Sequence, residues 1–251
     1  MTIKIVFLGT GAAIPMKRGL PCIALRIDSD IYLFDIGEGC QKRLFAMGLS
    51  PVKIKGIFIT HLHGDHYLGL FGLFQTMHLM GRKEPLVIIA PHKLKELLEA
   101  YENIGLLNID FPIEYIDTKP CELYRDGKII ISSFKVEHGI EAYGYKAQLK
   151  NGIAIVYTGD TRPCRSVVEE SEKADILIHE STFTSDMREE AYKEGHSTAA
   201  DAGKHAYEAN VKELVLFHIS ARYRNTDLLF YDAYRYFRNV NIAEDYMTLY
   251  V

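Results

Sequence analysis

Four side chains that commonly bind metal ions follow closely after an apolar run at residues 57–59. They are His61, His63, Asp65 and His66. In extended backbone alternate side chains share a side, so His61 and His63 can converge on one ion. Gly64 lets the backbone reverse, after which Asp65 and His66 can reach a second ion. Imidazole and carboxylate are the usual non-sulfur ligands of zinc, so this pattern predicts a metal site at a strand end rather than a solvated turn.

Four ligands cannot complete two metal sites, so further ligands are expected later in the chain. His138, Asp160 and His218 each stand at or just after the end of an apolar, strand-like run. An α/β architecture usually places its chemistry at such strand ends. Together with the first cluster they give seven ligands, which is enough for two metals that share one bridging carboxylate.

Glu180 and His196 form the next candidate pair. Glu180 ends the apolar run 176–178, and a carboxylate beside an imidazole can hold a proton donor in one tautomer. The alternative is that residues 196–198 only cap the helix that follows, and the sequence leaves both interpretations open. His179 points to the opposite side of its strand from Glu180 and is expected to be buried, whereas His205 is expected at the surface. Asp35 is expected to orient a ligand histidine rather than to bind metal.

Two cationic segments flank these residues in the sequence. Ser220, Arg222 and Tyr223 follow His218 directly, and this combination of guanidinium and hydroxyl groups could hold a phosphate. Lys17 and Arg18 form a second pair of cations, in an amino-terminal loop. We interpret all five as candidate substrate-binding residues.

The elements that must position these residues alternate between strand and helix patterns. No linker or repeat interrupts them, so one domain over residues 1–251 is expected. Asn151 and Gly152 are a strong hairpin signal between two late strands. Strands are expected at 3–8, 22–27, 31–34, 57–59, 86–90, 113–116, 129–134, 144–149, 153–157, 176–178 and 214–217, and helices at 38–47, 67–79, 93–103 and 199–209.

Composition narrows the class of protein. The 251 residues are 48% hydrophobic, which suits a large globular core. A net charge of −4 argues against indiscriminate nucleic-acid binding. No apolar run reaches the roughly 20 residues that span a bilayer, so a soluble, cytoplasmic protein without membrane contact is expected. The four cysteines are scattered without a Cys-x-x-Cys motif, which favours buried single thiols over disulfides.

The metal motif, with His138, Asp160 and His218, resembles the metallo-β-lactamase superfamily. Within it, the segments at 7–11, 34–38, 158–162, 179–183, 196–198 and 218–223 resemble ribonuclease Z, the zinc endonuclease family that removes 3′ trailers from precursor tRNA. The resemblance covers nearly the whole chain. It implies an α/β fold that is a four-layer αββα sandwich of two mixed β-sheets.

The resemblance also implies a role for each site residue. His61, His63 and His138 would hold one zinc, Asp65, His66 and His218 the other, and Asp160 would bridge the two. Asp65 would accept a proton from the attacking water. His196, oriented by Glu180, would protonate the leaving 3′ oxygen. Manganese or cobalt would suit the same ligands.

Two departures from the family concern binding of the substrate. Family members carry a protruding arm that grips tRNA, with the insertion point near 150–152, and this chain has only three residues there. The amino-terminal loop of the family commonly reads Pro-x-Lys-x-Arg-Asn, whereas Gly19 follows Arg18 here. Both departures leave the chemistry intact and weaken the case for tight tRNA binding.

Two other functions remain open at this stage. The nearest is a phosphodiesterase of the same superfamily that cleaves small diesters without recognising tRNA. The second is a non-catalytic RNA-processing subunit, which the filled ligand positions argue against. The resemblance further implies a homodimer, and the apolar character of the segment 68–80 agrees with a partly exposed interface helix.

Overall fold

The computed structural model describes residues 2–251 and divides the chain into two compact units. Unit 1 consists of the chain up to Gly9, Gly19–Thr118 and Glu244–Val251. Unit 2 consists of Thr10–Arg18 and Lys119–Ala243. Each unit is built around one seven-stranded sheet. The expectation of a single domain over the whole chain stays a prediction.

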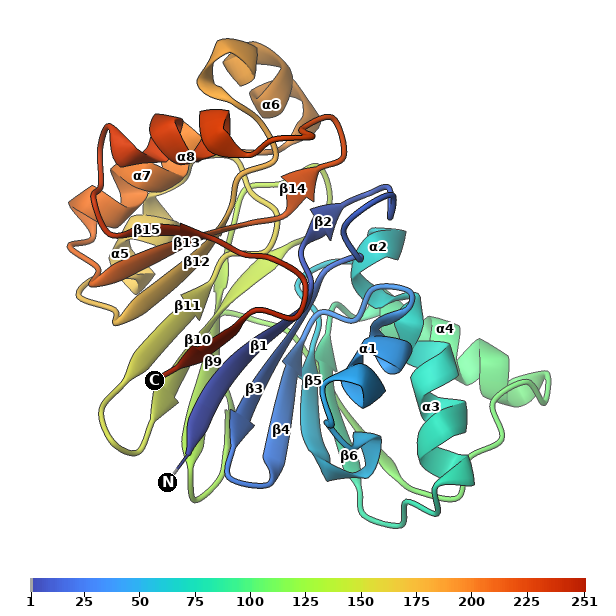
Figure 1. The fold of residues 1–251 in the computed structure, drawn as a ribbon. Coiled ribbons are helices and arrows are strands. Elements are labelled where there is room, and N and C mark those ends of the chain that lie inside the picture. Colours follow the sequence, from blue (N-terminus) through green and yellow to red (C-terminus); the bar gives the residue numbers. More distant parts are fainter. Residues whose placement is uncertain (1) are drawn as a thin grey trace. The chain divides into compact units, whose positions relative to one another are not determined.

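The sheet of unit 1 is mixed, with the order β16-β1-β3-β4-β5-β6-β7 (Figure 1). Its first four strands pair antiparallel, and the strands from β4 to β7 run parallel. The strands are β1 (Ile3–Gly9), β3 (Cys22–Ile27), β4 (Asp30–Phe34), β5 (Ile54–Phe58), β6 (Leu86–Ala90), β7 (Ile113–Asp117) and β16 (Thr248–Tyr250). The helices are α1 (Cys40–Ala46), α2 (Gly64–Tyr67), α3 (Gly69–Leu79) and α4 (Lys93–Asn103), with a short 3₁₀ turn, η1 (Pro51–Lys53).

The sheet of unit 2 is also mixed, with the order β15-β13-β12-β11-β10-β9-β8. The strands from β8 to β11 are antiparallel, and those from β11 to β15 are parallel. The strands are β8 (Cys121–Arg125), β9 (Ile129–Lys135), β10 (Tyr143–Leu149), β11 (Ala154–Tyr157), β12 (Ile176–Glu180), β13 (Glu213–Phe217) and β15 (Val240–Ile242), with a small separate pair, β2 (Gly11–Ala12) and β14 (Ile219–Ser220). The helices are α5 (Arg165–Glu170), α6 (Arg188–Glu194), α7 (Ala199–Glu208) and α8 (Asp227–Tyr234), with the 3₁₀ turn η2 (Ser185–Met187).

Each unit has its own apolar core. In unit 1 the helix α3 buries Leu70, Leu73, Phe74 and Met77, which follow helical spacing and pack with the strand residues of the same sheet. In unit 2 the helix α7 turns a row of alanines toward the strands β12 and β13. Small side chains let a helix approach a sheet closely, and Gly203 touches the backbone of Ala233 in α8 in the same way. The helix positions are therefore fixed by complementary packing on the sheets.

The connection between β10 and β11 is a tight turn, as the Asn151–Gly152 pair predicts. Leu149 and Ile153 are hydrogen-bonded across it, with the Leu149 nitrogen 2.8 Å from the Ile153 oxygen. Gly152 has φ 90°, a conformation that glycine adopts without steric cost. No arm interrupts this hairpin.

The cysteines differ in part from expectation. Cys22 at the start of β3 and Cys40 at the start of α1 form a disulfide, with their Cα atoms 6.2 Å apart. The prediction of single thiols is therefore wrong for this pair, because folding brings together two buried residues that the sequence separates by 18 positions. Cys121 and Cys164 are free thiols, as predicted, but Cys121 is exposed and Cys164 is only partly buried, so the expected burial is wrong for both.

Two further observations concern the surface. Across residues 2–251, none of the helices combines the length and apolarity that crossing a bilayer requires. Most apolar side chains of the segment 68–80 lie in the core of unit 1, while Leu68, Leu79 and Met80 are exposed. The homodimer interface suggested for this helix stays a prediction.

Candidate metal and catalytic centre

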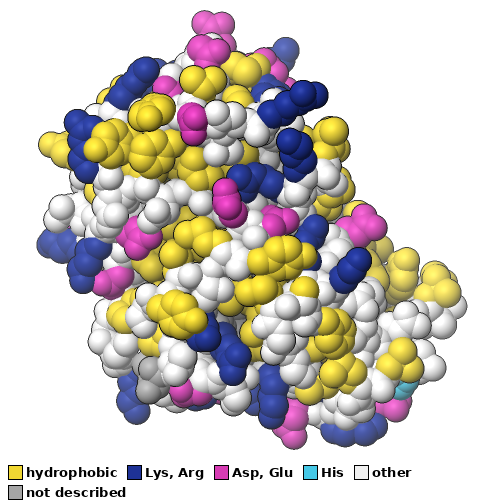
Figure 2. All heavy atoms as spheres, in the orientation of Figure 1, with side chains coloured by type: hydrophobic (Ala, Val, Ile, Leu, Met, Phe, Trp, Pro, Cys, Tyr) yellow, Lys and Arg dark blue, Asp and Glu magenta, His cyan; other side chains and the backbone are white. Residues whose placement is uncertain are grey.

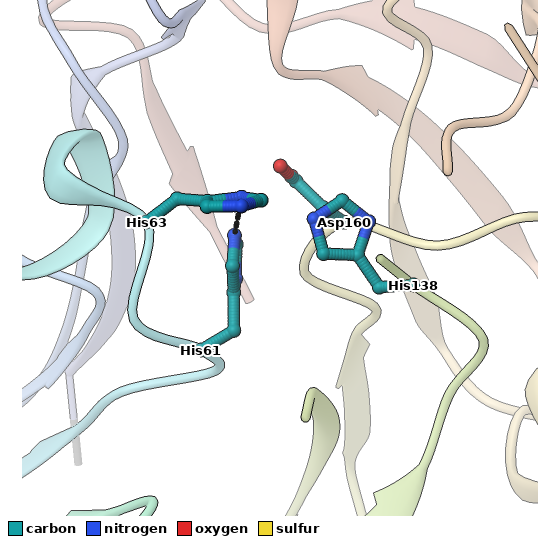
Figure 3. A group of neighbouring side chains, drawn as sticks. All are labelled: His61, His63, His138 and Asp160. Carbon is teal, nitrogen blue, oxygen red and sulfur yellow. Dashed lines mark hydrogen bonds between the residues drawn. The ribbon is translucent and has the colours of Figure 1, made fainter. Parts of the chain in front are cut away.

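In unit 1, the four early ligand candidates follow β5 as expected. His61 and His63 converge, with His61 Nε2 lying 3.1 Å from His63 Nδ1 (Figure 3). The chain then turns into α2, where Asp65 Oδ2 lies 3.6 Å from His66 Nε2. The rings of His61 and His66 have centroids 4.1 Å apart. All four side chains thus gather at one end of the parallel strands.

Asp35 positions this cluster from behind. Its carboxylate accepts hydrogen bonds from His66 Nδ1 at 2.7 Å and from the Thr60 backbone nitrogen at 2.8 Å. Thr60 Oγ1 donates to the same carboxylate and lies 2.9 Å from His61 Nδ1. Asp35 is fully buried and has φ 54°, a conformation that Asp tolerates better than most residues. Its contact with a ligand histidine is as expected from the sequence.

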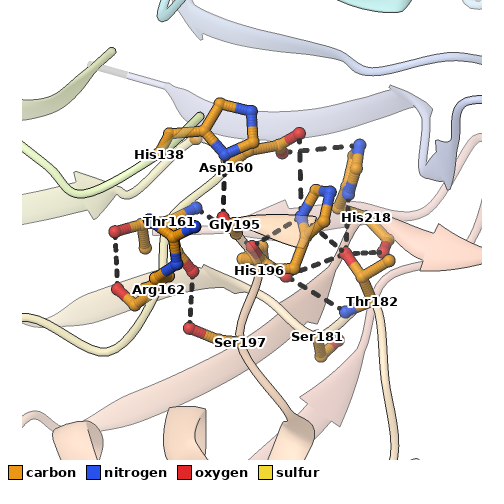
Figure 4. A network of polar contacts seen from close by, with 12 residues as sticks. His138, Asp160, Thr161, Arg162, Ser181, Thr182, Gly195, His196, Ser197 and His218 are labelled. Atoms are coloured by element: carbon orange, nitrogen blue, oxygen red, sulfur yellow. Dashed lines mark hydrogen bonds and ion pairs between the residues drawn. The ribbon is translucent and has the colours of Figure 1, made fainter. Parts of the chain in front are cut away.

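In unit 2, the later candidates lie at the ends of neighbouring elements. His138 follows β9, Asp160 follows β11 and His218 follows β13, where the strand ends meet (Figure 4). His218 Nε2 lies 3.4 Å from Asp160 Oδ1. One donor atom each from Asp160, His196 and His218 lies within 4.8 Å of the other two. His218 has φ 57°, and strained backbone of this kind is concentrated at functional sites.

The hydrogen bonds of unit 2 fix the orientation of its histidines. His138 Nδ1 donates to the Gly195 carbonyl at 2.7 Å. Gly195 has φ 87°, and a Cβ there would come within 2.9 Å of His138 Nδ1, so only glycine suits this position. Thr182 Oγ1 donates to Glu180 and lies 2.9 Å from His218 Nδ1, from which it can accept. Burial lowers the pKa of His138, which keeps the imidazole neutral as a metal ligand must be.

A common pattern follows for four of the candidate ligands. In each of them Nδ1 faces a group that can only accept its hydrogen bond: a carboxylate, a carbonyl, or a hydroxyl whose own proton is donated elsewhere. The proton therefore lies on Nδ1 and the lone pair on Nε2. The four are His61, His66, His138 and His218. Metal-ligating histidines in proteins show this second hydrogen bond almost always. The donor set therefore fits a divalent metal of the zinc type.

Glu180 and His196 lie together as the carboxylate–imidazole pair that was one of two open interpretations. Glu180 Oε1 accepts from His196 Nδ1 at 2.9 Å, and the same carboxylate binds the backbone nitrogens of Thr161 and Thr182. Burial pushes the pKa of Glu180 upward, but the contacts with His196 outweigh it and the net pKa is lowered. The carboxylate is therefore ionised and suited to stabilise an imidazolium.

The alternative interpretation of residues 196–198 also holds. Thr198 is the N-cap of α7, and its hydroxyl and backbone form a reciprocal capping box with Asp201. Capping fixes the start of the helix, and the residues just before it present His196 to Glu180. One short segment thus carries both the structural and the chemical feature.

The candidate substrate-binding residues differ in exposure. Lys17 is exposed, while Arg18 is engaged by the Thr10 hydroxyl at 2.8 Å and by the Ala243 carbonyl. Arg222 lies over the Phe183 ring at 4.4 Å. The Tyr223 hydroxyl accepts from the Thr184 backbone nitrogen at 2.8 Å. Their role toward a substrate stays a prediction.

Ser220 Oγ lies 3.2 Å from Arg222 Nε and accepts a hydrogen bond from it. The guanidinium of Arg222 is therefore oriented by a hydroxyl and an aromatic ring, and it also contacts the Met187 sulfur at 3.1 Å and the Glu190 carboxylate at 3.7 Å. Such restraint lowers the entropy cost of binding a phosphate.

Two histidines outside the site were assigned in opposite ways. His179 is buried, as predicted, and its Nδ1 donates to the Glu180 carbonyl at 2.7 Å. His205 was expected at the surface but is 7% exposed, so that prediction is wrong. Its Nδ1 lies 2.9 Å from His179 Nε2. The reason is that α7 packs its His205 side toward β12, which the sequence alone did not reveal.

Sequence reasoning missed three contributors to the site. Thr60, Thr182 and Gly195 hold ligand histidines in place, yet each looks like an ordinary loop residue in the sequence. Thr60 and Thr182 do stand directly beside or within the predicted motifs. A search for hydroxyl groups next to candidate ligands would have found them.

Comparison with known proteins agrees with this geometry. A family model described as "Beta-lactamase superfamily domain" matches residues 32–219. A ribonuclease Z of Sulfurisphaera tokodaii is 39% identical, with 96% of each chain covered. A ribonuclease Z of Methanothermobacter thermautotrophicus is 34% identical over 294 residues, covering 98% of this chain and 96% of its own. The crystal structure of human tRNase Z, short form, superposes with a TM-score of 0.85 at 31% identity and covers 98% of both chains.

These matches confirm the expected fold class and kind of enzyme. The two mixed sheets with their helices are those of the metallo-β-lactamase fold and are consistent with a four-layer sandwich. The histidine and aspartate clusters on this fold indicate a divalent-metal-dependent hydrolase. The chain therefore belongs to the ribonuclease Z family of the metallo-β-lactamase superfamily.

Proposed function

We propose that the protein is a zinc-dependent endoribonuclease that removes the 3′ trailer of precursor tRNA. Membership of the ribonuclease Z family supports this substrate. The observation that carries the proposal is the shared orientation of four ligand histidines, whose Nδ1 protons are held by neighbours within their own units. Metal binding gives a common reason for this shared orientation, because a metal ion takes the lone pair on Nε2.

Seven candidate ligands would hold two metal ions per subunit. In this proposal His61, His63 and His138 would hold one ion, Asp65, His66 and His218 would hold the other, and Asp160 would serve both. The imidazole and carboxylate donors suit zinc and would also accept manganese or cobalt. When bound, such a metal pair lowers the pKa of a water molecule and polarises the phosphoryl oxygen.

The residues of the chain perform the proton transfers. Asp65 accepts the proton of the attacking water. His196, held by Glu180 through Nδ1, protonates the leaving 3′ oxygen through Nε2. The products are a tRNA with a 3′-hydroxyl and a trailer with a 5′-phosphate. The ionised Glu180 would stabilise the imidazolium form of His196 that this proton transfer requires.

Neighbouring phosphates of the substrate would meet the cations already described. Lys17 is exposed and can approach a phosphate directly, and Arg222 is held in one orientation by Ser220. Arg18 and Tyr223 would hold the loops that carry Lys17 and Arg222 in place, through their contacts with Thr10 and Thr184. We further propose that the protein is a homodimer and that it acts in the cytoplasm. A light-scattering mass near the 28.6 kDa of one chain would reject the dimer.

The test is cleavage of a precursor tRNA by the metal-loaded protein, with mapping of both product ends. We expect a single cut at the 3′ side of the acceptor stem, with a 3′-hydroxyl on the tRNA. His66→Ala serves as the control that lacks one ligand. A loaded protein that leaves precursor tRNA intact would refute the proposed substrate.

A second candidate is a phosphodiesterase that acts on small diesters without recognising tRNA. The tight β10–β11 turn favours it, because no protruding segment is present there to contact tRNA. The net charge of −4 also favours it, because the chain as a whole does not attract the tRNA phosphates. The two candidates are separated by comparing kcat/KM for precursor tRNA and for bis(p-nitrophenyl) phosphate. Turnover of the small diester alone would support the second candidate.

A further inference from the structure

The outer surface of α8 and the residues around it combines exposed tyrosines with arginines. Leu228 is 66% exposed, Tyr231 60% and Tyr236 43%. Figure 2 shows hydrophobic side chains gathered over the region of α7 and α8, with lysine and arginine side chains beside them. We call Tyr231, Arg235, Tyr236 and Arg238 the α8 surface. Large exposed aromatic groups of this kind commonly mark an interaction site.

The charge of this part of the chain is opposite to that of the whole. Residues 219–240 contain four arginines and two aspartates, in a chain whose net charge is −4. One of the two aspartates, Asp232, is buried and accepts from the Ser185 backbone nitrogen at 2.6 Å and from its hydroxyl at 2.9 Å. Arg235 Nη1 lies 3.6 Å from Asp232 Oδ1, but the side chain of Arg235 is 70% exposed. Asp227 is exposed too, so arginines outnumber aspartates among the exposed charges of this segment.

The aromatic rings are arranged for stacking. Phe230 and Tyr234, four residues apart on α8, have ring centroids 5.3 Å apart with an angle of 21° between the planes. The guanidinium of Arg238 continues this stack at 4.5 Å from the Tyr234 ring. Lys204 of α7 lies 5.0 Å from the Tyr236 ring. Rings and cations that alternate in this way can hold bases and phosphates together.

The α8 surface is directly connected to the candidate site within unit 2. Asp232 of α8 binds Ser185, and Tyr223 binds Thr184. Both partners lie in the loop that begins at Thr182, whose hydroxyl contacts the ligand His218. A strand of RNA that leaves the site along this loop would meet α8 next.

We propose that the α8 surface binds single-stranded RNA, as an extended contact for the substrate of the ribonuclease, and this proposal rests on the proposed function. Tyr231 and Tyr236 stack on bases, while Arg235 and Arg238 contact phosphates. A second copy of the chain fits this surface less well, because a symmetric dimer would bring the arginines of identical patches together. The surface would supply part of the RNA contact that this chain lacks at its β10–β11 turn.

The experiment measures binding of a fluorescein-labelled oligouridylate to the full-length protein. We expect the double variant Tyr231→Ala/Arg235→Ala to weaken binding about tenfold or more, because loss of one stacked base alone has an effect of this size. Arg235→Ala alone should reduce the slope of log K against log salt concentration by about 0.7, the value for one phosphate contact on a single strand. Turnover of bis(p-nitrophenyl) phosphate should stay unchanged in both variants, because neither residue touches the site.

A matched control is available in unit 1. Tyr250 is 74% exposed, and Lys4 lies 4.8 Å from its ring, so Lys4→Ala/Tyr250→Ala removes the same chemistry from another surface. Equal binding by the α8 variant and this control would overturn the inference. Light scattering that shows the α8 variant converting a dimer to a monomer would also overturn it, by assigning the surface to a second copy. Failure of the unmodified protein to cleave precursor tRNA would instead refute the proposed function.

Discussion

Replacing Asp35 by asparagine tests whether the tautomer of His66 governs metal binding. In the structure the Asp35 carboxylate accepts from His66 Nδ1 at 2.7 Å and from Thr60 through nitrogen and hydroxyl. In Asp35→Asn the amide oxygen can keep the Thr60 nitrogen, which places the amide N–H₂ against His66 Nδ1. Two N–H groups cannot bond, so His66 must move its proton to Nε2. The variant therefore blocks the nitrogen that should bind the metal.

The expected magnitude has two parts. Loss of a partner that orients a ligand histidine typically costs about 10–100-fold in metal affinity or activity. Loss of one hydrogen bond to a buried charged group costs about 1.5–3 kcal/mol of stability. Backbone strain adds little, because Asn tolerates the φ of 54° found at this position nearly as well as Asp. The metal-free variant should thus still fold while its affinity for zinc falls.

The assay is competition for zinc against a chromophoric chelator, together with urea unfolding of the metal-free protein. Asp117→Asn is the matched control, since Asp117 lies 2.9 Å from His92 Nδ1 on the exposed end of β7 in the same unit. The control should bind zinc like the unmodified protein. Unchanged zinc affinity in Asp35→Asn would refute the reasoning, because the Nδ1 contacts would then have no bearing on metal binding.

Three further predictions address the proton donor, the metal and the buried histidine pair. Glu180→Gln should lower kcat on precursor tRNA by about 10²–10⁴-fold, the usual contribution of a general acid, but spare bis(p-nitrophenyl) phosphate, whose nitrophenolate leaves without a proton; equal losses on both substrates would contradict the role of His196. Dialysis against a chelator should abolish turnover of both substrates and readdition of zinc should restore it, and activity that survives a verified metal content of zero would contradict the proposal. Burial lowers the pKa of His205 to about 3, whereas a histidine in the unfolded chain has a pKa of about 6.5. The unfolded state therefore binds more protons, and the free energy of unfolding falls as the pH drops from about 6.5 toward 3. Between pH 7 and 5.5 this group should lower the free energy of unfolding by about 1.3 kcal/mol. Urea unfolding of His205→Asn should show a correspondingly smaller loss, whereas an identical pH dependence would contradict the assignment.

The sequence predicts most of the fold because its strands are long, apolar and bounded by clear turns. The hairpin at Asn151 and Gly152 matches the structure closely. The strand that leads to His61 exists as expected, but β5 covers Ile54–Phe58 rather than 57–59. The strand β8 was missed, because none of its five residues is buried and its apolar pattern is weak. The short strands β2, β14, β15 and β16 were also missed, because two or three residues carry no readable periodicity. These strands depend on pairing partners far away in the chain, which local pattern does not reveal.

The candidate site was predictable as a set of ligands but less so as a network. His138, Asp160 and His218 stand out only as a set, because three metal-binding side chain types follow three separate apolar strands. The environment of His205 was not predictable, since the side of α7 that faces the sheet depends on how the alanines of that helix pack. The Cys22–Cys40 pairing likewise depends on where α1 begins relative to β3.

The β10–β11 turn has a consequence for the variety of substrates in this family. The alignment with the Methanothermobacter thermautotrophicus relative runs over 294 residues while covering 98% of a chain of 251, so that relative carries extra residues inside the matched region. Leu149 and Ile153 are adjacent partners in the hairpin, so a segment of any length could leave and return there without moving the sheet. The hairpin tip is therefore a suitable insertion site. A natural or engineered segment inserted there would alter which RNA the protein binds, while the hydrolytic residues stay in place.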